Sequence, residues 1–225
     1  MIAALGRLAP GDPAIAFCSA VTGLGDKAIL AAPVPRDDAS RLLLLQLQAS
    51  GVELATPARG ASGDGMPAGI RPATDPAAGV RLLHLTLAAL LEGSLGETAR
   101  LWAAAVKASS GILSLDGSGY EKAPELPALR LEIRRLGPEL LFVSKRLAER
   151  LDGELDALAK VPVVTLGTSG CRVFGRRVPA PAGSALEPDS FTAAFCVAYL
   201  EGATPLEAAG RAVLAAGPRS VTPAG

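Results

Sequence analysis

Histidine is nearly absent from this 225-residue sequence, which has only one, His84. Cysteine is also scarce: Cys18, Cys171 and Cys196 stand far apart, and no pair of them has the spacing of a zinc motif. An odd number of separated cysteines predicts buried free thiols in a reducing compartment. The sequence therefore offers no metal ligands and gives no support to a secreted disulfide scaffold.

Net charge is lacking as well, because 22 basic and 22 acidic residues cancel. Bulk charge thus offers no attraction to nucleic acid or to an anionic membrane surface. The longest apolar stretches, around residues 42–47 and 85–91, fall short of the roughly 20 residues that a membrane-spanning helix needs. No basic run precedes an apolar stretch at the N-terminus, so no signal peptide is predicted. We expect a cytoplasmic protein without a nucleic-acid or membrane partner.

The abundant residues are small and apolar, since the hydrophobic fraction is 49% and the aromatic fraction only 4%. Strands alternate with helices, which predicts a single α/β domain over residues 1–225 with a mainly parallel sheet. Strands are predicted at residues 27–35, 80–85, 111–116, 139–143, 161–166 and 171–174, and a short one begins at Val52. Helices are predicted at residues 15–22, 37–50, 96–109, 126–136, 145–160, 190–200 and 205–216. Residues 55–79, rich in Gly, Pro, Ala and Asp, are predicted to form a loop.

The most informative motif is GSALEPDSF at residues 183–191, which precedes an apolar helix. It resembles the signature of the ribokinase-like (PfkB) carbohydrate kinases, in which D-T-x-G-A-G-D-x-F leads into a helix. Asp189 and Phe191 match that signature, whereas Leu186, Glu187 and Pro188 replace its G-A-G. The order of elements resembles the same family across most of the chain. The resemblance implies a ribokinase-like three-layer sandwich and Asp189 as the candidate catalytic base.

A second motif, TLGTSG at residues 165–170, follows an apolar strand. It is similar to the family's V-T-x-G-x-x-G, where a strand-turn-strand borders the nucleotide. The resemblance implies that Thr165, Gly167 and Gly170 bind ATP. A tight turn between two strands requires glycine for backbone reasons alone, so both explanations stay open.

Other family features are missing from the chain. Family members begin with a strand and lid strands that carry sugar contacts, whereas this chain reaches its first core helix almost at once. We therefore predict that the N-terminal lid region is missing. The asparagine that holds sugar hydroxyls falls on Ala16, and the N-x-x-E that helps organise Mg²⁺ falls on residues 144–147, Ser-Lys-Arg-Leu. These replacements speak against Mg²⁺ binding.

Asp189 has two interpretations. A kinase base needs a carboxylate within reach of the acceptor hydroxyl, with positive potential beside it for the transferring phosphoryl group. Free N–H groups at a helix N-terminus supply that potential. Pro188 has no N–H, Leu186 adds bulk, and Glu187 adds negative charge where phosphates would approach. Alternatively, residues 187–190 are an ordinary helix start, with proline and acids in the first turn.

Two polar residues lie within predicted strands. Asp116 ends a strand at the sheet edge where ligands of α/β proteins usually bind, although a plain loop also explains it. His84 lies in an apolar strand pattern and is predicted to be a packed core histidine.

The function predicted from these observations is a shortened, degenerate PfkB-like protein with degraded phosphotransferase activity and a binding or subunit role. The alternative is a slow ATP-dependent kinase of a sugar or small alcohol, with Asp189 as general base. A sugar or nucleotide is the expected ligand. Because lid strands are lacking, apolar surface is expected near the N-terminal elements. Such a surface predicts a homodimer or hetero-complex whose interface is centred on residues 10–55. Leu43 and Leu47 are the expected contacts.

Overall fold

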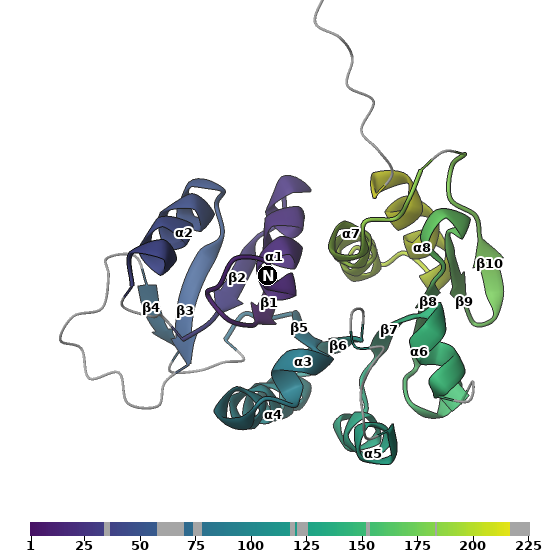
Figure 1. Cartoon of the computed structure of the whole chain (residues 1–225), viewed down its shortest axis with the longest axis horizontal. Helices are drawn as coiled ribbons and strands as arrows, with labels where there is room; N and C mark the ends of the chain where they lie inside the picture. The colour runs from purple at the N-terminus through teal and green to yellow at the C-terminus, as the bar shows by residue number, and fades with distance from the viewer. Residues whose placement is uncertain are drawn as a thin grey trace, which may run out of the picture.

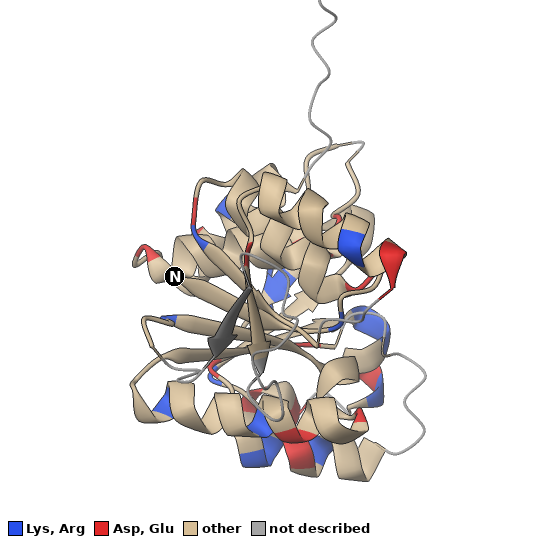
Figure 2. Ribbon diagram, turned by 90° about the vertical axis from the view of Figure 1, so that its left-hand side faces the viewer, with Lys and Arg blue, Asp and Glu red and all other residues tan. Residues whose placement is uncertain are grey.

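The computed structural model describes residues 1–33, 37–57, 70–73, 78–117, 120, 126–151, 154–182 and 184–216. These residues form one ten-stranded sheet with helices on both faces (Figure 1). Most charged residues lie on the helices and loops around the sheet (Figure 2). In the described ranges, no helix combines the length and the apolar character needed to cross a membrane.

The strands of the sheet are β1 (Ile2–Leu5), β2 (Ala28–Ala31), β3 (Glu53–Pro57), β4 (Ile70–Ala73), β5 (Leu82–Thr86), β6 (Ile112–Asp116), β7 (Leu140–Ser144), β8 (Val161–Thr165), β9 (Cys171–Val173) and β10 (Arg176–Val178). Their order across the sheet is β10-β9-β8-β7-β6-β5-β1-β2-β3-β4. Strands β1 to β8 pair in parallel, whereas β9 pairs antiparallel with β8 and with β10. The predicted mainly parallel sheet is confirmed.

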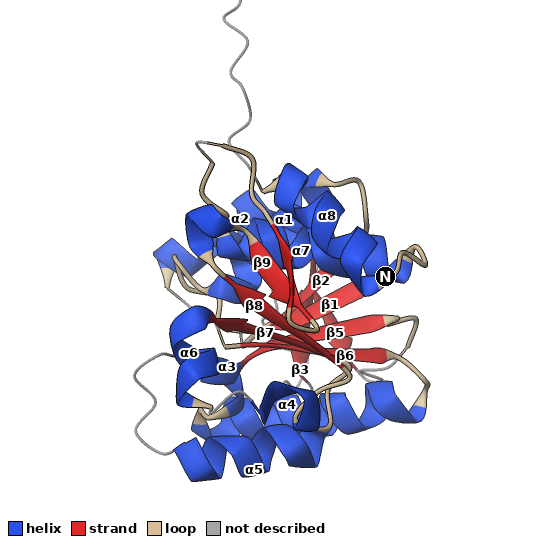
Figure 3. Cartoon of the chain, turned by 90° about the vertical axis from the view of Figure 1, so that its right-hand side faces the viewer, coloured by secondary structure: helices blue, strands red, loops and turns tan. Residues whose placement is uncertain are grey.

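Helices cover the two faces of the sheet as separate layers (Figure 3). One layer contains α1 (Pro13–Gly23), α2 (Asp38–Ala49), α7 (Pro188–Leu200) and α8 (Pro205–Ala215), and the other contains α3 (Leu87–Leu90), α4 (Gly93–Ala108), α5 (Leu126–Leu136) and α6 (Lys145–Arg150). Several of these helices begin at a residue whose side chain accepts a backbone N–H of the first turn. The predicted three-layer α/β architecture is confirmed.

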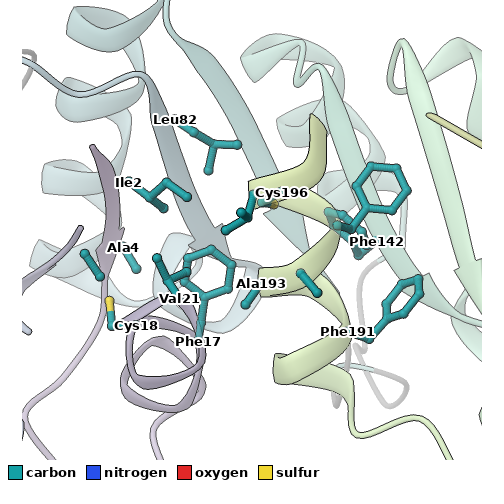
Figure 4. Close-up of a cluster of buried hydrophobic side chains, with 14 of the residues drawn as sticks. Ile2, Ala4, Phe17, Cys18, Val21, Leu82, Phe142, Phe191, Ala193 and Cys196 are labelled. Atoms are coloured by element: carbon teal, nitrogen blue, oxygen red, sulfur yellow. The ribbon is translucent and has the colours of Figure 1, made fainter. Parts of the chain in front are cut away.

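The larger core lies between the sheet and the layer of α1, α7 and α8. Residues 191–198 of α7 are all buried, which is typical of a helix surrounded by protein on every side. The Phe142 ring of β7 meets Phe195 of α7 edge to face, with centroids 5.2 Å apart. Figure 4 shows Phe17 of α1 beside Ala193 of α7, and both belong to the same buried cluster as Leu82 of β5. This packing fixes the start of α7 relative to the start of α1.

His84 is a core residue, as predicted, with 1% of its surface exposed. Its ring stacks on Phe17 at a centroid distance of 3.9 Å, and its Nδ1 lies 3.1 Å from the Ser114 hydroxyl. The buried Cys196 thiol donates to the same hydroxyl across 3.8 Å. Burial lowers the pKa of His84 to about 3, so the ring is neutral at physiological pH.

Some sequence predictions need correction. No strand was predicted before the first core helix, but the buried strand β1 precedes α1 and lies between β5 and β2. A run of four apolar residues, Ile-Ala-Ala-Leu, is too short to show a periodicity, so the sequence pattern did not predict this strand. The loop predicted at residues 55–79 contains the end of β3 and all of β4, while residues 58–69 and 74–77 lie outside the described ranges. The helix predicted at residues 145–160 ends at Arg150.

The connection from β1 to α1 consists of residues 6–12, all of which are described. A link of this length holds no lid strands, which agrees with the predicted loss of the lid region. The connection is also tight: a Cβ added to Gly6 would lie 2.5 Å from both Ala14 Cβ and Asp12 Oδ1. Gly6 therefore allows the start of α1 to sit directly against the end of β1.

Candidate functional site

The start of α1 and the start of α7 meet at the edge formed by the carboxyl ends of the parallel strands. Helices α1 and α7 pack against each other along the same face of the sheet. Asp12 caps α1, and its two carboxylate oxygens accept the N–H groups of Arg7 at 3.0 Å and Ala14 at 2.9 Å. Asp189 lies in the first turn of α7. Ligands of open α/β sheets bind at this edge, so the junction is the candidate site.

The first turn of α7 is closed by its own side chains. The carboxylate of Glu187, the N-cap residue, accepts the Ser190 N–H at 2.7 Å. Pro188 is the first residue of the helix and has no N–H to offer. Leu186 is buried, with 7% of its surface exposed, and belongs to the core cluster under α7. Each residue that replaces G-A-G thus has a structural task at the helix start.

Asp189 is half-buried and lies among other carboxylates. Burial, together with the charges of Asp116, Glu187 and Asp12, raises the pKa of Asp189 to about 7. Asp116, at the end of β6, is 4% exposed, and its Oδ2 accepts the Thr192 hydroxyl at 3.2 Å. The site edge therefore combines four acidic side chains, and Asp189 is about half-protonated near neutral pH.

The basic side chain that acts on Asp12, that of Arg7, is already engaged in an ion pair. Arg7 lowers the pKa of Asp12 through its charge, but the Arg7 guanidinium forms an ion pair with Glu92 at the start of α4. Burial outweighs Arg7, so the pKa of Asp12 is raised overall. The local field is consequently unfavourable for a phosphate group.

The turn between β8 and β9 lies elsewhere on the same edge, because β7 separates β8 from β6, the strand that ends in Asp116. The Thr165 hydroxyl donates to the Val143 carbonyl at 3.3 Å, so it is used between strands. Gly170 has φ 92°, and a Cβ added there would lie 2.1 Å from the Val178 carbonyl oxygen. Gly167 has φ 59° but would meet nothing within 4 Å. Gly170 is thus explained by backbone packing, whereas Gly167 faces open space.

This contrast gives a stability prediction. Gly170→Ala is expected to lower the free energy of unfolding by about 3 kcal/mol, because the methyl group must displace backbone atoms in addition to the strain of positive φ. Gly167→Ala suffers only the left-handed backbone cost, about 1 kcal/mol. Urea denaturation of both variants measures the difference. Equal losses would show that the close approach of Val178 to Gly170 is not important.

Magnesium does not fit the residues at the family's N-x-x-E position. The Ser144 hydroxyl accepts the Leu147 N–H at 3.2 Å and so caps α6. Leu147 is fully buried in the core cluster beneath α4 and α5. In the part of the chain that is described, no group of three or more His, Cys, Asp or Glu side chains could hold a metal ion.

Sequence reasoning identified Asp189 but not its neighbours as a group. The structure brings Asp189 together with Asp12 and Asp116, which come from a different helix and a different strand. The available signal was position: each of these carboxylates follows a strand or precedes a helix at the carboxyl edge. Asp116 carries that signal in the sequence, because it ends a predicted strand, whereas Asp12 does not follow a predicted strand.

No protein-family model and no curated protein matches the sequence. Solved structures do match the fold. An uncharacterized sugar kinase from Pyrococcus horikoshii has 18% identity and a TM-score of 0.74, covering 96% of this chain and 91% of that chain. A PfkB protein from Polaromonas sp. JS666 has 20% identity and a TM-score of 0.72, covering 96% and 94%.

A third match is the aminoimidazole riboside kinase from Salmonella enterica, solved with aminoimidazole riboside and an ATP analog. It has 16% identity and a TM-score of 0.70, with 96% of this chain and 92% of that chain covered. These likenesses span nearly the whole of each chain, and the predicted ribokinase-like architecture is confirmed. The chain therefore has the ribokinase-like fold of the PfkB sugar kinases.

Proposed function

We propose that this protein is a PfkB-like protein that has lost phosphotransferase activity and serves as a binding protein or subunit. The observation that carries the proposal is the hydrogen bond from the Ser190 N–H to the Glu187 carboxylate at the start of α7. In a kinase of this fold, free N–H groups at that helix start would face the transferring phosphoryl group. Here the protein's own carboxylate takes that place.

The energetic consequence is large. Removing one donor of an oxyanion site typically costs roughly 3–4 kcal/mol in the barrier, or 10²- to 10³-fold in rate. The first turn of α7 lacks one donor at Pro188 and has another occupied at Ser190. Four carboxylates at the same edge add repulsion toward a triphosphate. Together these effects bring phosphotransfer close to background.

Ligand binding is compatible with the same geometry. Carboxylates accept hydrogen bonds from hydroxyl groups, so the edge of Asp12, Asp116 and Asp189 suits a sugar or another polyol. The open face beside Gly167 leaves room for a nucleotide at the β8–β9 turn. We propose that ATP binds there weakly and without strong dependence on Mg²⁺, since the residues at 144–147 do not suit the ion.

The second candidate is a slow ATP-dependent kinase. One observation favours it: a pKa of about 7 for Asp189 lies close to the working pH that suits a general base. The carboxylate would take the proton of the acceptor hydroxyl as that oxygen attacks the γ-phosphorus, and the bond from this phosphorus to the β–γ bridging oxygen would break to release ADP. The occupied first turn of α7 argues against ordinary rates.

A phosphotransfer assay decides between the two. We expect the wild-type protein, given ATP, Mg²⁺ and a panel of sugars and nucleosides, to form no phosphorylated product above background. Asp189→Asn is the matched control, because it removes the candidate base and adds no bulk. Turnover near 10 s⁻¹, a typical enzyme rate, that disappears in Asp189→Asn would make the protein a kinase.

We also propose that the protein self-associates through α2, and the exposure of its leucines indicates which of them form the contact. Leu47 is 3% exposed and Leu43 is partly buried, so neither can carry an interface alone. Leu42 and Leu45, which are 59% and 62% exposed, lie on the outer surface of the same helix. We expect a dimer that Leu42→Glu with Leu45→Glu dissociates, as measured by light scattering. Leu131→Glu on α5, also exposed, is the control; a wild-type monomer at high concentration would contradict the proposal.

A further inference from the structure

The hairpin of β9 and β10 carries three exposed arginines at one end of the sheet: Arg172, Arg176 and Arg177. Its register places Arg177 directly opposite Arg172, and Arg176 opposite Val173. Val173 is buried in the core under α7 and α8. Because side chains alternate along a strand, Arg172 and Arg177 project together from the other face of the hairpin.

That other face shows a gradient of burial along one row of the sheet. The row runs from Val143 of β7 to Val164 of β8, then to Arg172 and Arg177. Val143 is fully buried, Val164 is half-buried, and both arginines are exposed. Helix α6 contacts β7 and β8 on this face, and the exposed arginines lie on the two strands that follow in the sheet order. The arginine pair therefore lies at the exposed end of this row, next to the half-buried Val164.

The pair is electrostatically unfavourable without an anion. Like charges directly opposite each other on neighbouring strands destabilise a sheet. Arg100, Arg134 and Arg211 each pair with a glutamate, but no described carboxylate forms an ion pair with Arg172 or Arg177. The Arg177 Nε instead donates to the Ser169 carbonyl at 3.3 Å. This bond holds the Arg177 side chain beside the Gly167–Ser169 turn, and no described residue forms a hydrogen bond with its terminal nitrogens.

We propose that Arg172 and Arg177 form an anion-binding site for the phosphate group of a small ligand. Directly opposite residues have Cβ atoms about 5 Å apart, so two guanidinium groups can reach one phosphate or two adjacent ones. The planar guanidinium matches phosphate oxygens with two parallel hydrogen bonds. An anion between the arginines also removes their mutual repulsion, which favours occupancy.

This site is separate from the carboxylate edge at α7 and does not depend on whether phosphotransfer is lost. It deepens the proposed function in one respect: it offers the phosphates of a nucleotide at the β8–β9 turn a positive partner that the start of α7 does not provide. The nucleotide assignment rests on the proposed function, whereas the phosphate site rests on the hairpin alone.

Titration calorimetry of the full chain with inorganic tripolyphosphate and with ATP tests the inference. We expect wild-type binding by both, weakened at least tenfold in Arg172→Gln and in Arg177→Gln. Arg176→Gln is the matched control, because it removes the same charge from the same hairpin on the opposite face; its affinity should change less than twofold. Arg177→Lys keeps the charge but loses the planar fork, so we expect an intermediate affinity.

Two results would overturn the inference: no tripolyphosphate binding by the wild type at millimolar concentration, or an equal loss of affinity in Arg176→Gln and Arg177→Gln. Thermal melting shows whether each variant is folded, and the exposed positions make folding the expected result. Comparable affinities for tripolyphosphate and ATP would show that the site recognises phosphate alone, whereas tighter ATP binding would indicate an additional contact with the nucleoside. Both results support a phosphate site, and neither depends on the phosphotransfer assay.

Discussion

His84 is expected to lower the free energy of unfolding by about 3 kcal/mol as the pH falls from 6.5 to 4, and replacing His84 should remove this loss. The pKa of His84 is about 3 in the folded protein because the ring is buried, against 6.5 when it is unfolded. Between these values the unfolded chain binds a proton that the folded chain does not. Stability therefore falls as pH falls, by about 1.4 kcal/mol per pH unit.

Asp189 produces the opposite slope. Its pKa is raised from 3.8 to about 7, so the folded chain holds a proton that the unfolded chain releases between these values. Its contribution falls as pH rises toward 7, and solvent screening at this half-buried position makes the slope shallower than that of His84. The two residues partly cancel in the wild type, which can hide both effects in a single pH profile.

Substitutions at His84 and Asp189 separate the two pH dependences of stability. Urea denaturation from pH 4 to pH 8 should show that the stability of the wild type relative to His84→Gln declines on acidification below pH 6.5. Asp189→Asn should gain stability over the wild type as pH rises from 4 to 7, and the gain should then level off. A difference between His84→Gln and wild type that does not vary with pH would mean that His84 titrates normally and is accessible to water.

Opening the first turn of α7 is expected to create an anion site. Glu187→Gly with Pro188→Ala frees the Ser190 N–H and restores an N–H at the first helical position. Hydrogen bonds to charged groups contribute about 1.5–3 kcal/mol each, so tripolyphosphate affinity should rise about tenfold or more. The measurement is calorimetry in a chain that also carries Arg177→Gln, which suppresses binding at the hairpin.

Glu201→Gln is the control for this gain. Glu201 lies at the other end of α7 and pairs with Arg211, so the substitution removes one negative charge without touching the first turn. Affinity should stay unchanged in this variant. If Glu201→Gln raises the affinity as much as the double substitution does, net charge rather than the occupied first turn controls anion binding.

The sequence predicted the layered fold because its strands are apolar and its helices carry clear start and stop residues. Helix α5 was predicted with its observed bounds, since a strong apolar stripe at helical spacing runs from Leu126 to Leu136. Strand β1 was not predicted, because a run of only four apolar residues shows no periodicity. The helix at α2 was predicted with Leu43 and Leu47 as interface contacts, but Leu47 is buried whereas Leu42 and Leu45 are exposed; a leucine-rich run does not indicate which leucines face the sheet.

The candidate site was predictable in part. The motif at residues 183–191 identified Asp189 and the loss of the G-A-G segment. It could not show that Glu187 caps the helix, because capping depends on whether the side chain turns toward a backbone N–H of the first turn. Nor could it show that the charges of Asp12 and Asp116 act on Asp189, since those residues come from distant parts of the chain and come close to it only when β1 and β6 lie in one sheet. The opposition of Arg172 and Arg177 likewise depends on hairpin register.

The central claim is that the Glu187 carboxylate holds the first turn of α7 and keeps phosphate away from it. Backbone amide resonances measured by NMR during titration with ATP and Mg²⁺ test this claim directly. We predict that the resonances of Asp189, Ser190 and Phe191 stay in place up to millimolar ATP, while those of the β8–β9 turn and the β9–β10 hairpin shift. Saturable shifts of the Ser190 amide at lower ATP concentrations than any hairpin shift would contradict the claim, because phosphate would then displace Glu187 from the helix start.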